Sequence, residues 1–567
     1  MNRTHISCLF LLFTSILIAG CEKVLDKKNL TAINPDLVWN DPVAAKAYLN
    51  DIYKNVMPGL PQEGNNSDEA AFRSQLPEQL RGTATINSWG GYWDYSNIRK
   101  INFLFEKIES GTIDPGTKKE IKGQAYFFRA WLYFRMVRAY GGVPIILRAQ
   151  DANEGEALSV PRNKTSECIT QIITDLDSAI ANVPDAYGSA DAGRIDKVAA
   201  MAFKGRVLLY YASPQFNPQG DINRWQQAYN ATKSARDVSL AQGKGLYASF
   251  KNIWYDDLNK EMIMYRRFSY PNDTYSQMGY RPAAYVVGTY GSDWPTLGIV
   301  NAFPNKDGSD YNPVLQGYDT LWKNRDDRFY ATITYNGSDY GIKDLVTLNK
   351  YLWTYHQEDA PDPNQEGLQV WSVTSFYRNK GMDKTVDVGT ANMASVPAIE
   401  IRYAEVLLNF GEAANEIGNS SEALDVLYQI RARAGILPGA DNKYGITANS
   451  KVDIRNAYIR ERQVEFAFED KRWWDIRRWK RFDILNQQVN RYGLYITQKN
   501  PPFPEGKEDI NLIYDQFVNT VVKTDGGDNI NVRDNYYFYP LTRNELDRNP
   551  KLEQTKGWDG GTFDPLQ

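Results

Sequence analysis

Residues 115–140 carry apolar side chains at helical spacing on two faces, and this pattern constrains the fold more than any other feature of the sequence. The first face holds Ile121, Ala125, Phe128, Leu132, Met136 and Ala139, and the second holds Tyr126, Arg129, Tyr133, Val137 and Tyr140. A helix that is apolar on two sides must be packed on two sides. Asp114 is placed to cap this helix, with a proline at its first position, and Gly141-Gly142 ends it. The sequence therefore predicts a long helix in the interior of a helical body.

The same spacing recurs along much of the chain. Further helices are predicted near residues 41–56, 92–110, 164–182, 196–212 and 223–242. In the C-terminal half, a stripe from Ile399 to Ile417 predicts a helix that ends at Gly418-Asn419, and Ser420 can cap the next helix. Two helices joined by so short a turn form an αα-hairpin, the unit of tetratricopeptide-type repeats. Since no clean repeat period is visible, we expect repeat-like hairpins and not a regular solenoid.

Long segments without helical spacing are expected to be irregular, and they cover residues 57–91, 243–395 and 486–550. The central one contains short strand-like runs such as residues 329–333. Irregular segments of this length are uncommon in a compact body unless they are functional. The predicted fold class is therefore mainly α, with tetratricopeptide-like helix hairpins and large loop-rich segments between them. One body is expected over residues 36–567, with a helical part at 36–242, a loop-rich part at 243–395 and a second helical part at 396–567.

The first residues predict where the cell delivers the protein. Arg3 precedes an apolar run over residues 6–18, which is too short to span a bilayer comfortably. Ile18-Ala19-Gly20-Cys21 then resembles the lipobox of bacterial lipoproteins. We expect a signal peptide at residues 1–20 and a tether at 21–35 whose lipidated Cys21 anchors the chain through two or more acyl chains. The alternative is a plain secretory signal with an incidental cysteine.

Side chains that carry most catalysis and metal binding are nearly absent. Of two His and three Cys, only His356 and Cys168 lie beyond residue 21. A Cys/His zinc site needs about four ligands, and a Ser-His or Cys-His nucleophile would depend on His356 alone. We therefore predict no catalytic residue, no metal and no cofactor. The net charge of −4 also argues against nucleic acid as a partner.

A basic run at residues 471–481 contains six Lys or Arg and three Trp. Taken alone, it is typical of a segment that binds nucleic acid or an anionic membrane. However, Glu461, Glu465 and Glu469 precede it at four-residue spacing, and such a row is destabilising without cations. The sequence therefore favours an internal ion-pair network in which Arg460, Arg462 and the basic run neutralise these glutamates. The alternative use of the glutamates, as the paired carboxylates of a glycoside hydrolase, is less favoured.

Two loop segments are rich in aromatic residues. Residues 89–95 hold four aromatics, and residues 285–294 hold Tyr285, Tyr290 and Trp294. An aromatic face suits the C–H face of a sugar ring, and flanking carboxylate, amide and guanidinium groups bond hydroxyls. The alternative is that these rings belong to the core.

Six segments, in order along the chain, resemble the signature of the SusD/RagB family of Bacteroidetes outer-membrane lipoproteins. The main one is residues 460–479, Arg-Glu-Arg-Gln-Val-Glu-Phe-Ala-Phe-Glu followed by Asp-Lys-Arg-Trp-Trp-Asp-Ile-Arg-Arg-Trp. The others lie at residues 123–144, 212–218, 401–409, 430–435 and 536–558. The resemblance covers essentially the whole chain after Cys21.

The resemblance implies that the tetratricopeptide-like helix hairpins form a scaffold for a large, irregular, loop-rich ligand-binding face. It also implies a cell-surface lipoprotein of the outer membrane that captures oligosaccharide without cleaving it. It implies delivery of that ligand to a partner SusC-like TonB-dependent transporter. In carbohydrate-binding members the site is built from two loops, which correspond here to about residues 60–97 and 280–300. The candidate glycan-binding residues in these loops are Trp89, Tyr92, Trp93, Tyr290, Asp293, Trp294, Asp68, Arg81 and Asn97. Acidic residues close behind Cys21 also resemble a surface-export signal.

Three other functions remain open from the sequence. The first is a peptide-uptake component of the same architecture. The second is a surface glycoside hydrolase, and the third is a helical scaffold that binds no small ligand.

Overall fold

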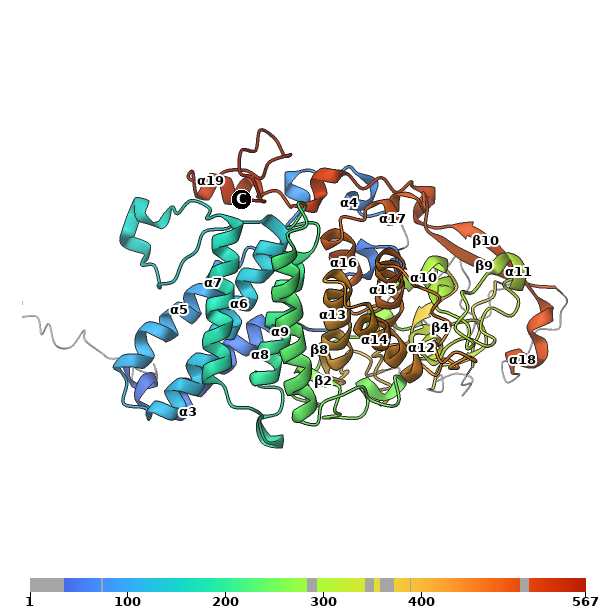
Figure 1. Ribbon diagram of the computed structural model, residues 1–567, viewed down its shortest axis with the longest axis horizontal. Coiled ribbons are helices and arrows are strands. Elements are labelled where there is room, and N and C mark those ends of the chain that lie inside the picture. Colours follow the sequence, from blue (N-terminus) through green and yellow to red (C-terminus); the bar gives the residue numbers. More distant parts are fainter. Residues whose placement is uncertain are drawn as a thin grey trace, which may run out of the picture.

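The computed structural model describes residues 35–72, 75–282, 293–341, 351–356, 372–387, 389–499 and 509–567, and these are mostly helical (Figure 1). The N-terminal helices are α3 (Pro42–Val56), α4 (Glu78–Arg81), α5 (Tyr95–Ser110), α6 (Pro115–Tyr140), α7 (Thr165–Asn182), α8 (Lys197–Ala212) and α9 (Ile222–Ala241). Short central helices follow as α10 (Leu297–Ala302), α11 (Pro313–Gln316) and α12 (Asp327–Thr332). The C-terminal helices are α13 (Tyr403–Glu416), α14 (Ser420–Arg433), α15 (Lys451–Glu465), α16 (Arg472–Arg478), α17 (Asp483–Asn486), α18 (Ile510–Ile513) and α19 (Arg543–Arg548).

The strands of the described residues form antiparallel pairs and no larger sheet. The pairs are β1 (Ala70–Ala71) with β3 (Trp294–Pro295), β2 (Met262–Arg266) with β8 (Ala398–Arg402), β4 (Ile333–Thr334) with β7 (Tyr377–Arg378), β5 (Ser338–Asp339) with β6 (Tyr351–Leu352), and β9 (Tyr492–Gln498) with β10 (Phe517–Lys523). Pairs this small need helices or loops to cover them, because a lone two-stranded ribbon is marginally stable in water.

Helix α6 has the place that its two apolar faces predict. It packs against α3, α5, α7 and α8, and every residue of the two stripes is buried except the half-buried Tyr126. The Asp114 carboxylate caps the helix by accepting the backbone N–H of Thr117 at 2.9 Å. Because both faces are buried, α6 forms the centre of the N-terminal helical half.

The predicted C-terminal hairpin is α13 followed by α14. Gly411 permits its close packing, since a Cβ there would lie 1.9 Å from the Tyr458 hydroxyl oxygen. Two details of the prediction are wrong. Ile399 belongs to β8 rather than to the helix, and Asn419, not Ser420, occupies the N-cap position of α14.

Two predictions of irregular or extended structure are also wrong. The run at residues 329–333 is mostly helix α12, because the Asp326 carboxylate accepts the backbone N–H groups of Arg328 and Phe329 and so starts a helix. The segment 486–550 contains β9 and β10, which pair along their whole length from Tyr492 opposite Lys523 to Gln498 opposite Phe517.

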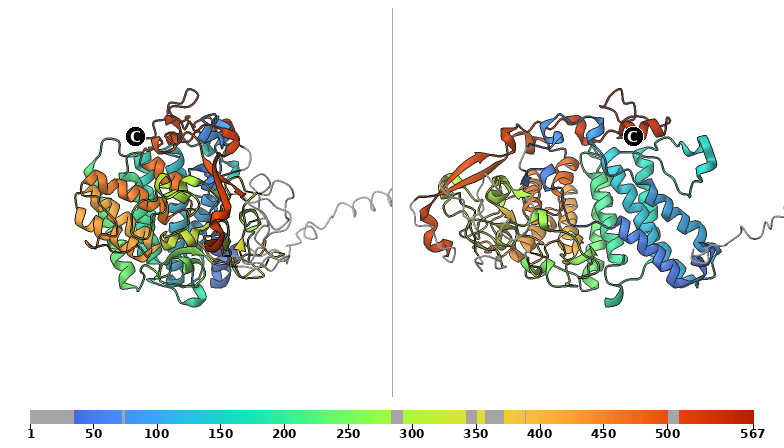
Figure 2. Two further views of the ribbon diagram at one scale, coloured as in Figure 1. Left: turned by 90° about the vertical axis from the view of Figure 1, so that its right-hand side faces the viewer. Right: turned by 180° about the vertical axis from the view of Figure 1, so that it is seen from behind.

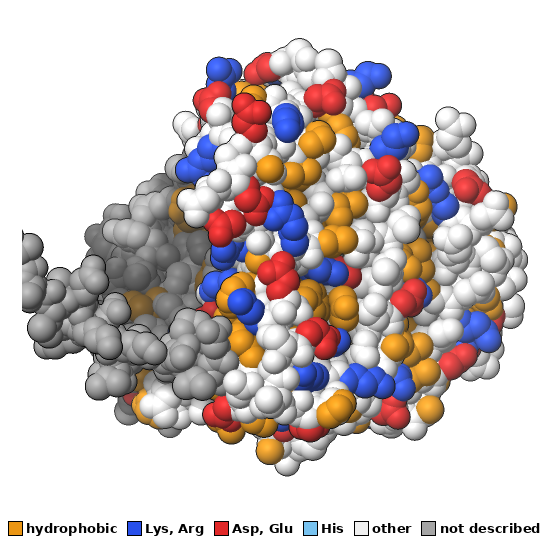
Figure 3. Space-filling model, turned by 90° about the vertical axis from the view of Figure 1, so that its left-hand side faces the viewer, with side chains coloured by type: hydrophobic (Ala, Val, Ile, Leu, Met, Phe, Trp, Pro, Cys, Tyr) orange, Lys and Arg blue, Asp and Glu red, His pale blue; other side chains and the backbone are white. Residues whose placement is uncertain are grey.

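The helices and the irregular segments occupy different ends of an elongated body (Figures 1 and 2). Helices α3 and α5 to α9 fill one end, and α13 to α16 lie in the middle. Strand β4 and the strand pair β9–β10 lie toward the other end. Charges of both signs are interspersed over the helical end (Figure 3). In the described part of the chain, no helix combines the length and apolarity needed to cross a bilayer.

Residues 471–479 of the basic run are buried, as predicted for an internal network, whereas Lys480 and Arg481 reach the surface. The partners of the run differ from the expected ones. Arg478 binds Glu412 and Asp475, and Lys471 binds Glu400 and Glu405. The row Glu461, Glu465 and Glu469 is instead neutralised by cations from elsewhere in the sequence, which are Arg328, Lys380, Arg402, Arg431 and Arg433. These cations overcome burial and hold the pKa of each of the three glutamates below its ordinary value. The network therefore joins the central segments to the C-terminal helices.

Candidate functional site

The two loops that the resemblance singles out meet in the structure. Ala71 pairs with Trp294 in the β1–β3 ladder, and the Thr296 hydroxyl donates to the carbonyl oxygen of Asp68 at 2.6 Å. Gly64 lies so close to Asp293 that a Cβ there would come within 2.5 Å of a carboxylate oxygen. We call residues 64–72 together with 293–296 the β1–β3 site.

The two candidate carboxylates of this site are buried and face the protein. Asp68 forms a two-pronged ion pair with Arg472, both contacts being 2.8 Å, and also accepts from Gln488 at 2.9 Å. Burial opposes ionisation of Asp68, but Arg472 outweighs it and lowers the pKa. Asp293 makes a 3.5 Å contact with Arg378, and its burial outweighs that contact and raises its pKa. Both carboxylates therefore lie inside the protein and do not project toward solvent, and Asp68 ties its loop to Arg472.

Trp89 and Trp294, two of the candidate glycan-binding rings, are buried. Trp89 is 4% exposed and packs against Tyr536, Tyr539 and Trp558, with ring centroids 4.2 to 5.8 Å apart. Trp294 is 0% exposed because it lies in β3 beneath neighbouring aromatic side chains. Neither ring presents a face on which a sugar can stack in this conformation, so for these two residues the core alternative applies.

Four other candidates are half-exposed, and their roles stay predictions. The Tyr92 hydroxyl donates to Glu63 at 2.6 Å, and Trp93 makes edge contacts with Tyr95 and Tyr140. The remaining contacts are from Arg81 to Gln75 at 3.2 Å and from the Asn97 amide to Asp94 at 2.8 Å. Tyr290 and Cys21 lie outside the described residues.

Phe72 is an exposed aromatic at this site that the sequence reasoning missed. Its ring is 43% exposed and stacks on buried Trp294, with centroids 6.2 Å apart and planes 16° apart. The available signal was a single aromatic at the end of a short Ala-Ala strand, which is too weak to identify without knowing that β1 pairs with β3. Phe72 presents an aromatic face to solvent, supported from behind by a second ring.

A hollow of about 330 Å³ shares Thr296 with the β1–β3 site. Thr296 lies in its wall, as does Arg491, which donates to the backbone carbonyl of Ala70. Its other polar and aromatic lining groups are Asn301, Tyr318, Gln488, Asn490 and Tyr492. A second hollow of about 300 Å³ shares Gly298 and Asn301 with it. The two hollows therefore meet at Gly298 and Asn301, and we call them together the depression. Phe72 is in the lining of neither and is connected to the depression through the β1–β3 ladder, in which Ala71 pairs with Trp294 and Thr296 follows in the wall of the first hollow.

Asn301 gives this depression an unused hydrogen-bond acceptor. Its amide oxygen is buried and has no hydrogen-bond partner among the described residues. A buried acceptor without a partner costs free energy that a bound hydroxyl or water recovers. In the described part of the chain, no group of three or more His, Cys, Asp or Glu side chains is arranged to hold a metal ion. The depression therefore offers hydrogen bonds and aromatic rings.

Comparison with known proteins places the chain in a family. The model of the SusD family matches residues 251–558. The chain belongs to the SusD family. A second model, described as starch-binding associating with outer membrane, matches residues 21–209.

Individual SusD relatives extend the likeness to nearly the whole chain. A SusD-like protein of Formosa agariphila, P38, is 24% identical over 507 residues, which cover 83% of this chain and 91% of the relative. A SusD-like protein of Bacteroides fragilis of known crystal structure is 27% identical with a TM-score of 0.73, covering 92% of this chain and 98% of that one. A second B. fragilis structure, of a SusD-like carbohydrate-binding protein, has a TM-score of 0.70 at 21% identity and covers 91% of this chain and 99% of that one. The mainly α fold with tetratricopeptide-like helix pairs is thus the SusD fold.

Proposed function

We propose that this SusD-family protein is a non-catalytic glycan-binding lipoprotein of the outer membrane. It is anchored through lipid on Cys21, faces the cell surface and passes captured oligosaccharide to a SusC-like TonB-dependent transporter. The glycan binds across the Phe72 ring and the depression that shares Thr296 with the β1–β3 site.

The observations that carry the proposal are an exposed ring in the β1–β3 site and an unused acceptor in the depression that shares Thr296 with that site. Phe72 stacks on Trp294 and keeps its other surface toward solvent, and the Asn301 amide oxygen has no partner among the described residues. Sugars are bound by such a combination, because their C–H faces stack on rings while their hydroxyls need hydrogen bonds. The family description and the carbohydrate-binding relative of the same fold support the same conclusion.

Calorimetric titration of residues 22–567 against a panel of neutral glycans tests the proposal. At least one oligosaccharide is expected to bind saturably, and chromatography after prolonged incubation should recover it intact. Phe72→Ala should weaken binding by about 2- to 12-fold, corresponding to roughly 0.5–1.5 kcal/mol for an aromatic contact. Asn301→Ala should weaken it as well, since one hydroxyl loses its acceptor.

Leu147→Ala is the matched control for Phe72→Ala. Leu147 is 46% exposed and follows α6, in a segment that does not line the depression. Its variant should bind with the affinity of the unaltered chain. Equal affinity of Phe72→Ala and Leu147→Ala would contradict the assigned site, tight binding of peptides with no glycan bound would favour the peptide-uptake alternative, and glycan cleavage would favour the hydrolase.

A further inference from the structure

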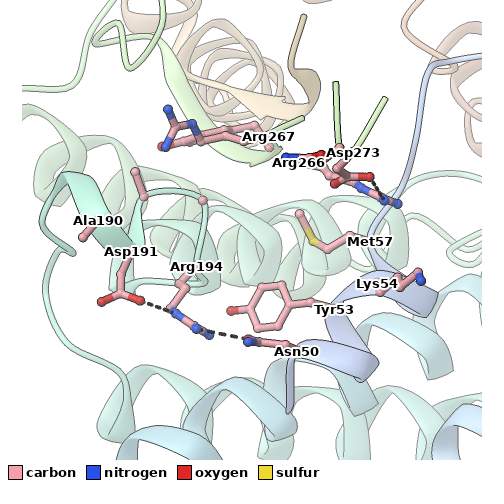
Figure 4. Close-up of a pocket in the computed structure, with 14 residues that line it drawn as sticks. Asn50, Tyr53, Lys54, Met57, Ala190, Asp191, Arg194, Arg266, Arg267 and Asp273 are labelled. Atoms are coloured by element: carbon pink, nitrogen blue, oxygen red, sulfur yellow. Dashed lines mark hydrogen bonds and ion pairs between the residues drawn. The ribbon is translucent and has the colours of Figure 1, made fainter. Parts of the chain in front are cut away.

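A second cavity, of about 540 Å³, lies where three separate segments of the chain meet, and none of its lining residues belongs to the β1–β3 site (Figure 4). The segments are the end of α3, the loop at residues 190–194, and the end of β2 with the chain that follows it. Gly193 in the loop has a φ of 95°, and a Cβ there would lie 3.4 Å from the carbonyl oxygen of Tyr265. Glycine therefore lets the loop lie against β2. The volume falls in the range of about 300–1,000 Å³ that small-molecule sites occupy.

Cations outnumber carboxylates in the lining of this cavity. The cations are Lys54, Arg194, Arg266 and Arg267, and the carboxylates are Asp191 and Asp273. Arg267 pairs with Asp257, which lies outside the lining. One positive charge is then left over, and the exposed Lys54 carries it, since no ion pair or hydrogen bond of its ammonium occurs among the described residues.

The arginines also keep unused N–H groups. The Arg194 Nε donates to Asp191 at 2.7 Å, and one terminal nitrogen donates to Asn50 at 3.1 Å. The second terminal nitrogen of Arg194 bonds neither Asp191 nor Asn50. The guanidinium of Arg266 comes only within 3.5 Å of Asp273, too far for a good hydrogen bond. Figure 4 shows Arg266 and Asp273 across the cavity from Arg194 and Asp191. The cavity thus offers more donors than its own carboxylates use.

The floor of the cavity is apolar. Met57 and Tyr265 are buried there, and Tyr53 is half-buried between them and the Arg194 loop. The Tyr53 hydroxyl is already engaged, because it donates to Gln124 at 2.6 Å and accepts the N–H of Ile195 at 2.8 Å. Tyr53 therefore contributes ring surface and not a hydroxyl. A ligand that fits carries an anionic group, further acceptors and an apolar face.

We propose that this cavity is a second binding site, for an acidic saccharide whose sugar carries a carboxylate. Arg266 and Lys54 bind the carboxylate, Asn50 and Asp191 face hydroxyls, and the sugar's C–H face covers Met57 and Tyr53. The choice of a saccharide rests on the proposed function, whereas the requirement for an anion rests on the cavity alone.

The test is a titration of residues 22–567 with digalacturonate and, separately, with its neutral dimethyl ester. Digalacturonate is expected to bind and the ester to bind at least tenfold more weakly. Arg266→Gln and Lys54→Gln should each weaken digalacturonate binding by about tenfold, because each removes a charge-assisted contact. Lys119→Gln, which removes an exposed charge from α6 outside the cavity, should leave it unchanged. Arg266→Lys should retain most of the affinity.

Each opposite result overturns the inference. Equal affinity for digalacturonate and its ester would show that the cavity does not require an anion. Equal affinity for tetraglutamate and digalacturonate would show that the ligand need not be a saccharide. Loss of digalacturonate binding in Phe72→Ala but not in Arg266→Gln would place the acid at the β1–β3 site, so that the cavity proposal fails while the proposed function stands. A third outcome separates the two proposals the other way. If no neutral glycan binds, but digalacturonate binds and Arg266→Gln abolishes that binding, the proposed function fails and the cavity proposal stands.

Discussion

Arg478 tests most sharply whether the basic run at residues 471–481 is scaffold. Its guanidinium is fully buried and makes two contacts with Glu412, at 2.6 and 2.7 Å, and one with Asp475 at 2.8 Å. In Arg478→Met, Asp475 keeps its partner Arg462. Among the described residues, the partner that Glu412 keeps is the indole N–H of Trp479 at 2.7 Å.

The expected loss of stability is therefore that of a buried carboxylate stripped of its cation. Removing one partner of a buried ion pair costs about 3–5 kcal/mol, because the remaining charge stays desolvated. The free energy of unfolding is measured from urea titrations, since urea does not screen charges. A double variant, Arg478→Met with Glu412→Leu, should recover much of the loss, because replacing both members of a buried pair by apolar groups is often nearly neutral.

Arg543→Met is the control for this experiment. Arg543 forms an ion pair with Asp547, one helical turn away, and both side chains are more than 60% exposed. Exposed pairs contribute about 0–1 kcal/mol. If Arg478→Met lowers stability no more than Arg543→Met, the interpretation of the basic run as a buried scaffold is refuted.

Three further predictions follow from burial and charge. Burial raises the pKa of Glu405, but Arg206 outweighs it and the pKa falls to about 2. The stabilisation by Glu405 is therefore present above pH 4.5 and lost toward pH 2. The melting temperature of Glu405→Gln should fall less between pH 4.5 and pH 2 than that of the unaltered chain, and an equal fall in both proteins would contradict this. Burial raises the pKa of the Cys168 thiol to about 11, so a thiol reagent at pH 8 should modify it only after unfolding, and rapid reaction of the native chain would show that it is accessible. Gly411→Ala should lower the free energy of unfolding by about 1–3 kcal/mol through the clash with Tyr458, and an unchanged urea midpoint would refute that packing.

The helical scaffold was predictable because its signal is local. The predicted helix at residues 164–182 is α7 at Thr165–Asn182, and that at 41–56 is α3 at Pro42–Val56. Repeating apolar faces and capping residues fix such elements without reference to the rest of the chain. The run at 329–333 misled because its β-forming residues follow a capping aspartate, Asp326, whose effect outweighs their propensity.

The candidate site was predictable as a region but not residue by residue. The loops at 60–97 and 280–300 do meet through β1 and β3. Which of two adjacent aromatics faces solvent depends on register, and here Trp294 lies beneath Phe72. Likewise, the partner of Asp68 is Arg472, some four hundred residues away in the sequence. Contacts of this kind are set by tertiary packing, which sequence spacing does not encode.

Amide hydrogen exchange with and without the best-binding neutral glycan tests the central claim most directly. We predict slowed exchange in residues 64–72 and 293–302, because these form the β1–β3 site with its Phe72 ring and part of the wall of the depression. Exchange in the helical end, including α5 and α7, should be unchanged. Protection confined to the helical end, with none in residues 64–72 or 293–302, would contradict the account.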